Sequence, residues 1–316
     1  MKKKEIGAGT ALRPDRKGFL YYLRRDWQLY LLVALPLVFA IVFYYLPFLG
    51  LSIAFLDYNT ITGFAGAKFI GFDAFKEIFT QKEFYKVLRN TLVLNLLDLL
   101  CSFPAPIILA IMLNEVKNKY FKKVSQTILY LPHFLSWVII AGIFYQLLQP
   151  NTGIINVMLT KSGGAEIPFL TEKYHWVASY VIIGVWQSMG WGTIIYLAAI
   201  TGINGDLYEA ATIDGAGRWR KIWNVTLPCI RGTIVVMLIM SLGRIVGISF
   251  ERPYTLSNTM VTDFSDVIST YVYRVGLSNQ RYNIATAVGL FQSVVGLIFV
   301  IGSDRVAKAI GEEGIL

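Results

Sequence analysis

Long apolar stretches with almost no charge set the strongest limit on what this 316-residue chain can fold into. Four of them contain no Asp, Glu, Lys or Arg, and two contain one such residue each. A bilayer core about 30 Å thick requires about 20 apolar residues per helix. In chain order the stretches cover residues 27–56, 90–114, 124–160, 174–205, 232–250 and 282–303. We therefore predict an all-α integral membrane protein with six transmembrane helices, one for each stretch.

The charge of the chain also fits a membrane protein. Only 16% of the residues are charged and 55% are hydrophobic, whereas an average soluble domain has about 25% charged residues. Much of the net charge of +9 comes from basic residues ahead of the first apolar stretch, where they orient a first transmembrane helix. These residues are Lys2, Lys3, Lys4, Arg13, Arg16, Lys17, Arg24 and Arg25. We therefore predict a multi-pass protein of the cell membrane with no nucleic-acid partner.

Lys and Arg residues in the short loops predict the orientation of the chain, because cytoplasmic loops are enriched in them. With the N-terminus inside, the segments 114–124 and 206–231 are cytoplasmic, and each contains four basic residues. The segment 57–88 is then external, and its basic residues are balanced by carboxylates. We expect an N-in, C-in topology.

The chain divides into a membrane domain and two short tails. The expected parts are a cytoplasmic basic tail at 1–28, the six-helix transmembrane domain at 29–303, and a cytoplasmic C-terminal tail at 304–316. The segment 17–30 mixes aromatic residues with Arg24 and Arg25. It could lie along the inner membrane interface as an amphipathic helix, and the alternative is a disordered basic tail.

One polar loop, residues 204–229, separates the fourth and fifth apolar stretches. From Tyr208 it reads YEAATIDGAGRWRKIWNVTLPC. Asn204 or Asp206 can cap a helix start, because a short side-chain oxygen accepts the free backbone N–H groups of the first turn. The expected elements are a short helix at Leu207–Ile213, a turn at Asp214-Gly215, and a second helix from Arg218 to Leu227 that Pro228 ends.

The second helix of this loop is amphipathic. Its apolar face holds Trp219, Ile222, Trp223 and Thr226, and its polar side holds Arg218, Lys221 and Asn224. Connecting two membrane helices takes only a few residues, so the loop has a further use. It could dock a partner through Glu209 and the small side chains of Ala210 and Ala211, or it could lie flat on the membrane.

The spacing within the loop resembles the EAA signature of the permease subunits of binding-protein-dependent ABC importers. The matching residues are Glu209-Ala210-Ala211, Gly215, Val225 in place of Ile, and Leu227-Pro228. Other segments resemble carbohydrate-uptake permeases, and the last three resemble the subgroup that imports complex oligosaccharides in Gram-positive bacteria. These segments are Asn90-Thr91, Leu113-Asn114, LYLPHFLSW (129–137), NTGIIN (151–156), GISFERPYTL (247–256), DVISTYVYRVGL (266–277) and ATAVGLFQSVVGLI (285–298).

The resemblance implies a type I ABC importer permease with the maltose-type membrane fold. Its partners would be a second homologous permease, a cytoplasmic ABC ATPase dimer and an extracellular lipid-anchored solute-binding protein, and its substrate an oligosaccharide. The loop would be the cytoplasmic coupling helix between helices 4 and 5, with Glu209 paired to a basic residue of the ATPase. The residues implied in ATPase coupling are Glu209, Ala210, Ala211, Asp214, Gly215, Leu227 and Pro228.

The chain carries no catalytic signature of its own. The dipeptide Gly-Lys does not occur, so no Walker A loop can cradle a nucleotide phosphate. His133 and His175 are far from each other and from carboxylate clusters, and we predict no metal site. The chain is therefore predicted not to be an enzyme and to bind no cofactor, with ATP and Mg held by the partner ATPase.

Two charges fall inside predicted spans, Asp98 in the second and Arg244 in the fifth. A charge at the centre of a membrane helix costs about 2.5–3.5 kcal/mol on insertion scales and usually faces a pathway or a partner. We expect Asp98 and Arg244 to pair with each other, or Arg244 to face the translocation cavity and meet substrate hydroxyls or carboxylates. A static pair that only fixes helices two and five is the structural alternative.

Aromatic and amide side chains within the spans are candidates for the substrate pathway. Sugars require flat apolar faces for their C–H groups and amide or carboxylate groups for their hydroxyls. The candidates, besides Asp98 and Arg244, are Tyr145, Gln146, Trp186, Gln187, Glu251 and Gln292. Such aromatic residues more often serve packing or an interfacial belt, and glycines 184, 190 and 192 suit close helix packing.

Two other classes of membrane protein compete with an ABC permease. An ion-coupled secondary transporter would show internal repeats and midplane carboxylates on broken helices, and neither is evident in the sequence. A membrane enzyme would need a catalytic constellation, which the sequence does not suggest.

Overall fold

The computed structural model describes residues 18–247, 249–309, 311 and 314. The predicted basic tail ahead of residue 18 lies outside this range. The chain divides into two compact units, residues 1–52 and 53–316.

The first unit is helical over its described part. It contains α1 (Phe19–Arg25), α2 (Trp27–Ala40), the π-helical η1 (Ile41–Tyr45) and the start of the 3₁₀-helical η2 (Leu46–Phe55). Helical residues from Trp27 to Phe55 are long and apolar enough to cross a membrane, and none of the most apolar part is buried. A helix that is apolar on all sides suits a lipid environment. The predicted lead-in does form a helix, with Arg25 placed over the rings of Tyr21 and Tyr22.

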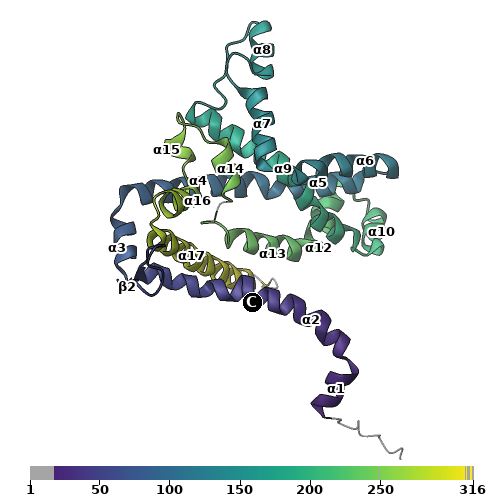
Figure 1. Cartoon of the computed structure of the whole chain (residues 1–316). Coiled ribbons are helices and arrows are strands. Elements are labelled where there is room, and N and C mark those ends of the chain that lie inside the picture. Colours follow the sequence, from purple (N-terminus) through teal and green to yellow (C-terminus); the bar gives the residue numbers. More distant parts are fainter. Residues whose placement is uncertain (1–17, 248, 310, 312–313, 315–316) are drawn as a thin grey trace, which may run out of the picture. The chain divides into compact units, whose positions relative to one another are not determined.

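The second unit begins with a small hairpin and then becomes almost wholly helical (Figure 1). In the hairpin, β1 (Leu56–Asp57) pairs antiparallel with β2 (Lys68–Phe69). The helices of its first half are α3 (Asp73–Thr80), α4 (Lys82–Ser102), α5 (Pro104–Glu115), α6 (Lys119–Tyr130), η3 (Leu131–Phe134), α7 (Trp137–Leu148), α8 (Ile154–Lys161) and α9 (Lys173–Thr201).

Shorter helices and two long ones make up the rest of this unit. They are α10 (Gly205–Ile213), α11 (Arg218–Lys221), the π-helical η4 (Ile222–Thr226), α12 (Leu227–Cys229), α13 (Arg231–Leu242), α14 (Glu251–Leu256), α15 (Thr262–Ser265), α16 (Ile268–Tyr273), the π-helical η5 (Arg274–Ser278) and α17 (Tyr282–Ala309).

Four helical segments in the described residues are long and apolar enough to cross a membrane, and two bent pairs raise the number to as many as six. The four cover residues 27–55, 82–115, 173–201 and 282–309. The bent pairs are 119–134 with 137–148, at 102°, and 218–229 with 231–242, at 62°. The predicted all-α membrane class is therefore confirmed in its coarse form.

Two predicted spans differ from the helices observed. The third stretch, 124–160, is broken because Pro132 lies in a 3₁₀ turn and Ser136 starts a new helix by accepting a hydrogen bond from the Ile139 N–H. The fifth stretch was expected to stay helical to residue 250, but α13 ends at Leu242.

Helix α9 lies in the middle of the second unit and packs against α4, α5 and α6. Glycines allow these close approaches. A Cβ on Gly190 would overlap the Leu129 carbonyl, and one on Gly192 would lie 2.9 Å from Pro106 Cγ. The predicted packing role of these two glycines is confirmed, because small residues let membrane helices approach closely.

Ion pairs join the segment 73–86 to the segment 263–281. Arg281 contacts Glu77 at 2.5 Å, Arg274 bridges Glu83 at 2.7 Å and Asp266 at 2.8 Å, and Lys86 contacts Asp263 at 3.1 Å. The hydrogen bonds from Arg281 lower the pKa of Glu77 below its ordinary value of 4.5. A lowered carboxyl pKa stabilises the fold above the ordinary pKa, so this contribution is lost as the pH falls through the pKa of the folded state.

Candidate functional site

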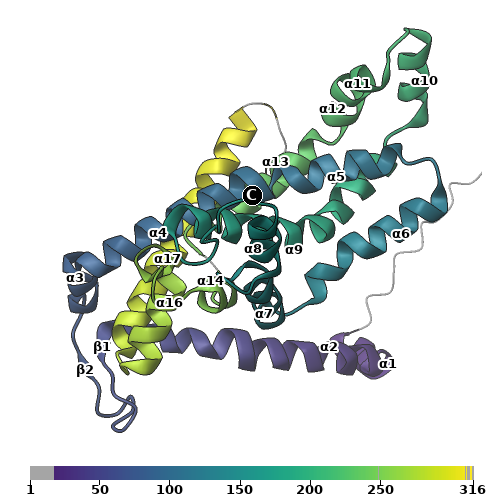
Figure 2. The same cartoon turned by 90° about the horizontal axis from the view of Figure 1, so that it is seen from above.

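The polar loop between α9 and α13 folds as two short helical pieces that contact each other. Figure 2 shows α10 lying beside α11. Asn204 caps α10, because its side chain accepts a hydrogen bond from the Asp206 N–H at 3.0 Å. The Tyr208 hydroxyl meets the Thr226 hydroxyl at 2.9 Å, and Lys221 donates to the Thr212 hydroxyl at 2.7 Å. The predicted helix, cap and turn are confirmed, although α10 begins two residues earlier than expected.

Gly215 ends α10 with a left-handed turn, at φ 74°. The Ala216 N–H donates to the Ala211 carbonyl at 2.8 Å and the Gly215 N–H to the Thr212 carbonyl at 3.1 Å. This pair of bonds is the Schellman pattern, which requires a residue that tolerates positive φ. Glycine at 215 therefore sets the angle between α10 and the helix that follows.

One face of α10 is exposed and chemically mixed. Glu209, Ala210 and Ile213 are all exposed, and Ile213 is 87% exposed. Ile213 lies three positions after Ala210 and four after Glu209, so it shares a side of the α-helix with each of them. Within the part of the chain that the structure describes, the Glu209 carboxylate forms no hydrogen bond or ion pair. A free carboxylate beside an exposed isoleucine and a small residue can receive a basic and partly apolar partner.

The second helix of the loop does not end where we expected. Pro228 was predicted to end it, but the helix continues through Pro228 to Cys229 and bends by 62° into α13. The π-helical turn η4 ends at Thr226, two residues before this proline. Proline removes one backbone donor, and a wider turn of this kind accommodates such a local change in the hydrogen-bond ladder. The loop is thus nearly continuous with a membrane helix.

The predicted apolar face of the second helix borders a groove against α5. Its volume is about 640 Å³, and it is lined by Ile107, Ile108, Ile111, Met112, Glu115, Arg218, Trp219, Ile222, Trp223 and Leu227. Trp219 and Trp223 remain 76% and 66% exposed. Thr226, the fourth residue of that face, is buried. The two tryptophans therefore border the groove without being covered.

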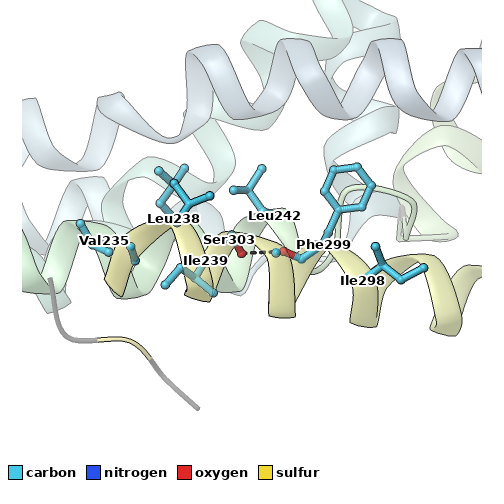
Figure 3. Close-up of a pocket in the computed structure, with 10 residues that line it drawn as sticks. Val235, Leu238, Ile239, Leu242, Ile298, Phe299 and Ser303 are labelled. Carbon is cyan, nitrogen blue, oxygen red and sulfur yellow. Dashed lines mark hydrogen bonds between the residues drawn. The ribbon is translucent and has the colours of Figure 1, made fainter. Parts of the chain in front are cut away.

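A second groove, of about 500 Å³, lies between α13 and α17 (Figure 3). Its walls are almost wholly aliphatic and aromatic, with Val235, Leu238 and Leu242 on α13 and Ile298 and Phe299 on α17. The Ser303 hydroxyl donates to the Phe299 carbonyl at 2.6 Å, so it offers no free donor. Such a surface suits a lipid chain or another apolar helix, not a polar substrate.

The fifth span is interrupted between α13 and α14. Amide side chains from neighbouring helices donate hydrogen bonds to backbone carbonyls at the interruption. Asn95 donates to the Ile245 carbonyl at 2.5 Å, and Gln292 donates to the Val246 carbonyl at 2.9 Å. Irregular backbone within a membrane protein is tolerated only where it is buried in protein or lines a water-filled cavity. The interruption meets the first condition at Ile245 and Val246, which are buried, whereas Arg244 beside them is exposed.

Asp98 forms an ion pair, but not with the predicted partner. It accepts two hydrogen bonds from Arg252, at 2.6 and 3.1 Å, in a bidentate arrangement. Arg244 is exposed, and within the described residues it forms no ion pair or hydrogen bond. The predicted pairing of Asp98 with Arg244 is therefore wrong. Because the fifth span stops at Leu242, the chain returns through α14 and brings Arg252 to Asp98 instead.

Arg252 is enclosed by aromatic rings and backbone. Its guanidinium lies 3.7 Å from the centre of the Tyr180 ring and 5.4 Å from the Trp137 ring, and it donates to the Tyr180 carbonyl at 2.5 Å. Gly184 leaves the space for it, since a Cβ there would overlap the guanidinium. The pair thus locks α14 to α4 and α9.

Replacing Gly184 with Ala should destabilise the protein. The added methyl must displace the Arg252 guanidinium, and overpacking of this kind costs about 1–3 kcal/mol. Gly142→Ala is the matched control, because a Cβ at Gly142 meets nothing within 4 Å and alanine favours a helix. The stability of both variants is measured by thermal unfolding of the purified protein in detergent. Equal unfolding midpoints for the two variants would contradict the proposed fit.

The predicted pathway residues have divergent environments. The Tyr145 hydroxyl donates toward the Leu256 and Ser257 carbonyls, at 3.4 and 3.3 Å. The Gln292 amide donates a hydrogen bond to the Val246 carbonyl. Trp186 packs edge-on against Phe144. Three others form no side-chain hydrogen bond within the described residues: Gln146 and Glu251, which are exposed, and Gln187, which is half-buried.

Several residues that organise the site were not predicted from the sequence. Asn95 supports the interruption, Arg252 pairs with Asp98, and Trp176 donates to the Leu256 carbonyl at 2.8 Å. A fifth helix that reaches residue 250 would have placed Arg252 outside the membrane. The glycines at 243 and 247 were the available signal that the helix stops early.

Comparison with known proteins identifies the family. Residues 102–312, which include both the helix pair and the interrupted span, match the family described as the inner membrane component of binding-protein-dependent transport systems. The chain belongs to this family. As a family member it is a multi-pass membrane protein and a permease component of a transport system.

Similar proteins extend the match over nearly the whole length of this permease. The protein LplB of Bacillus subtilis (strain 168) is 43% identical over 293 residues, which cover 93% of this chain and 92% of LplB. YteP of the same organism, a polygalacturonan/rhamnogalacturonan transport system permease protein, is 43% identical over 303 residues, with 96% and 94% covered.

A chain of known structure has the same fold. It belongs to a bacterial ABC transporter involved in the import of the acidic polysaccharide alginate, and it is 41% identical, with a TM-score of 0.84 over 93% of this chain and 99% of that one. The alginate transporter has also been solved in complex with a periplasmic protein bound to an alginate pentasaccharide. The match supports the type I ABC permease fold of the chain.

Proposed function

We propose that this permease is one subunit of an ATP-driven importer that carries an oligosaccharide delivered by an external, lipid-anchored solute-binding protein. A second, homologous permease and a cytoplasmic ABC ATPase dimer complete the importer, and the ATPase holds ATP and Mg. The chain itself binds no cofactor. The named carbohydrate relatives support the substrate class. The observation that carries the proposal is the exposed face of α10, with the free carboxylate of Glu209.

We further propose six spans with both chain ends in the cytoplasm, in which the bent pair 119–134 and 137–148 counts as one span and α13 forms the fifth, with 218–229 ahead of it in the cytoplasm. This arrangement places α10 and α11 in the cytoplasm, where the basic side chains of Arg218, Arg220 and Lys221 satisfy the enrichment of Lys and Arg in inner loops. It places α3 and the ion pairs between 73–86 and 263–281 outside, where a binding protein arrives. The charge balance there is consistent with an external face.

Coupling follows from the continuity of the helices. In the proposed cycle, ATP closes the ATPase pair and moves the exposed face of α10. Helix α10 is fixed to η4 by the Tyr208–Thr226 hydrogen bond and to α11 by the hydrogen bond from Lys221 to Thr212, and η4 continues through α12 into α13. Movement of α13 reaches the interruption at 243–250, so access to the pathway switches by largely rigid-body motion. The residues assigned to this coupling are Glu209, Ala210, Ala211, Asp214, Gly215, Leu227 and Pro228.

Site-specific cross-linking tests the position of the ATPase. Cys101 and Cys229 are first replaced by Ser, and Ala210→Cys is introduced in the full complex. A short thiol-to-amine cross-linker should then join residue 210 to the ATPase subunit, because Ala210 is exposed beside Glu209. Ser162→Cys, an exposed position on the proposed external side, is the control. A product of equal yield from both positions, or none from residue 210, would count against the proposal.

A further inference from the structure

Three aromatic rings gather at the interrupted fifth span. Phe250 stacks on Tyr254, with ring centres 4.6 Å apart and planes at 26°. Tyr273 of α16 lies 4.9 Å from Phe250 and 5.5 Å from Tyr254. We name these three residues the aromatic cluster. Tyr254 is 51% exposed and Tyr273 is 38% exposed, so ring surface remains available to another molecule.

Two unpaired charges lie close to the aromatic cluster in the chain. Arg244 and Glu251 are exposed, and within the described residues neither forms an ion pair or a side-chain hydrogen bond. Glu251 lies three positions before Tyr254 and therefore on the same side of α14. Arg244 lies at the other end of the interruption, after α13. Although only seven residues separate the two charges in the chain, they do not neutralise each other.

The orientation of α14 is fixed by its other side. Arg252, Pro253 and Leu256 are buried, with Arg252 held by Asp98 and the Leu256 carbonyl held by Trp176 at 2.8 Å. A helix with these residues buried must present Phe250, Glu251 and Tyr254 on the opposite side. The exposed rings and the carboxylate are therefore held in place before any ligand arrives.

A lipid-facing position does not suit this surface. Two unpaired charges beside irregular backbone would each carry a large cost in hydrocarbon. Both features are tolerated where they line a water-filled cavity. The groove between α13 and α17, in contrast, is apolar in all of its lining side chains except Ser303. The aromatic cluster and its charges are thus chemically distinct from the surfaces that suit lipid.

We propose that the aromatic cluster, Glu251 and Arg244 form a saccharide-binding surface in the translocation pathway, and that it takes sugars bearing carboxylates. The inference rests on the proposed function of the permease. The rings stack on the C–H faces of the sugar rings, and the Glu251 carboxylate accepts hydrogen bonds from hydroxyls. The Arg244 guanidinium binds a sugar carboxylate in a bidentate fashion, which is its best-matched partner. Asp98 is excluded from this role because Arg252 already neutralises it.

Uptake by the complete reconstituted complex tests the surface. Proteoliposomes contain both permeases and the ATPase, with ATP inside and the cognate binding protein outside, and the probe is labelled trigalacturonate. Arg244→Gln should lower the number of molecules accumulated per ATP hydrolysed by about tenfold, because a charge-assisted pair is lost. Arg244→Lys keeps the charge, so its ratio should stay within about threefold of the wild-type ratio. Tyr254→Ala should lower the same ratio by about tenfold. Tyr254→Phe should leave the ratio unchanged, because stacking requires only the ring.

Lys161→Gln is the matched control, since it removes an exposed cation far along the chain from the interruption. Equal ratios for Arg244→Gln and the wild type would overturn the inference, as would an equal loss in the Gln and Lys variants. A wild-type complex that accumulates neutral maltotriose but not trigalacturonate would also overturn it, and would leave the proposed function intact. Failure of the proposed function itself has a separate signature, which is no ATP-dependent uptake of either trisaccharide by the wild type.

Discussion

Glu209→Lys should abolish coupling between ATP hydrolysis and transport. The Glu209 carboxylate is exposed on α10 and has no partner within the described residues, so its partner is expected on the ATPase. Loss of a hydrogen bond to a charged group costs about 1.5–3 kcal/mol, and a lysine there adds repulsion against a basic residue. We expect ATP hydrolysis stimulated by the loaded binding protein, and uptake with it, to fall by more than about tenfold.

The control for this variant is Asp57→Lys, the same change of charge at an exposed strand residue far from the helix pair. It should retain hydrolysis and uptake within about twofold, since exposed charges contribute little. Glu209→Gln should be intermediate, because the amide keeps an acceptor but loses the charge. Full activity of Glu209→Lys in an assembled complex would remove α10 from the coupling mechanism.

Arg252→Ala should destabilise the membrane domain more than any other single change considered. Removing one partner of a buried ion pair leaves the other charge uncompensated, at a cost of about 3–5 kcal/mol. Asp98 would lose both of its hydrogen bonds, and α14 would lose its attachment to Tyr180. We expect a lower midpoint of thermal unfolding for the purified protein and severalfold less protein in the membrane.

Two further variants separate the Asp98–Arg252 pair from Arg244. The double variant Asp98→Asn with Arg252→Gln removes both charges while keeping hydrogen-bonding groups, so its stability should lie closer to the wild type than that of Arg252→Ala. Arg244→Ala should leave the unfolding midpoint unchanged within about 0.5 kcal/mol of stability, because Arg244 is exposed and unpaired. A large loss of stability in Arg244→Ala, with none in Arg252→Ala, would contradict the observed pairing.

Periodicity and local chemistry were enough to predict the membrane class and the helix pair. Charge-free stretches identify helices because the bilayer sets their length. The cap at Asn204 and the turn at Gly215 are local events, since each depends on a side chain and a backbone group only a few residues apart. The structure agrees with both.

The Asp98–Arg252 pair could not be predicted in the same way. It joins residues 154 positions apart, and it depends on where α13 stops and how α14 returns. Asn95 and Gln292 stabilise that interruption by binding its carbonyls, and such tertiary hydrogen bonds leave no periodic signal in the sequence. The prediction that Pro228 ends the second helix of the loop was wrong for a related reason. A π-helical turn ahead of the proline lets the helix continue to Cys229.

Tests of transport energetics address the central claim most directly. Proteoliposomes hold the complete complex, with ATP inside, the loaded binding protein outside, and ionophores that dissipate ion gradients. We predict accumulation of labelled trisaccharide, either trigalacturonate or maltotriose, that requires both ATP and the binding protein and persists with the ionophores present. Accumulation that stops when the ion gradients are dissipated, and that proceeds without ATP, would contradict the account and favour an ion-coupled secondary transporter.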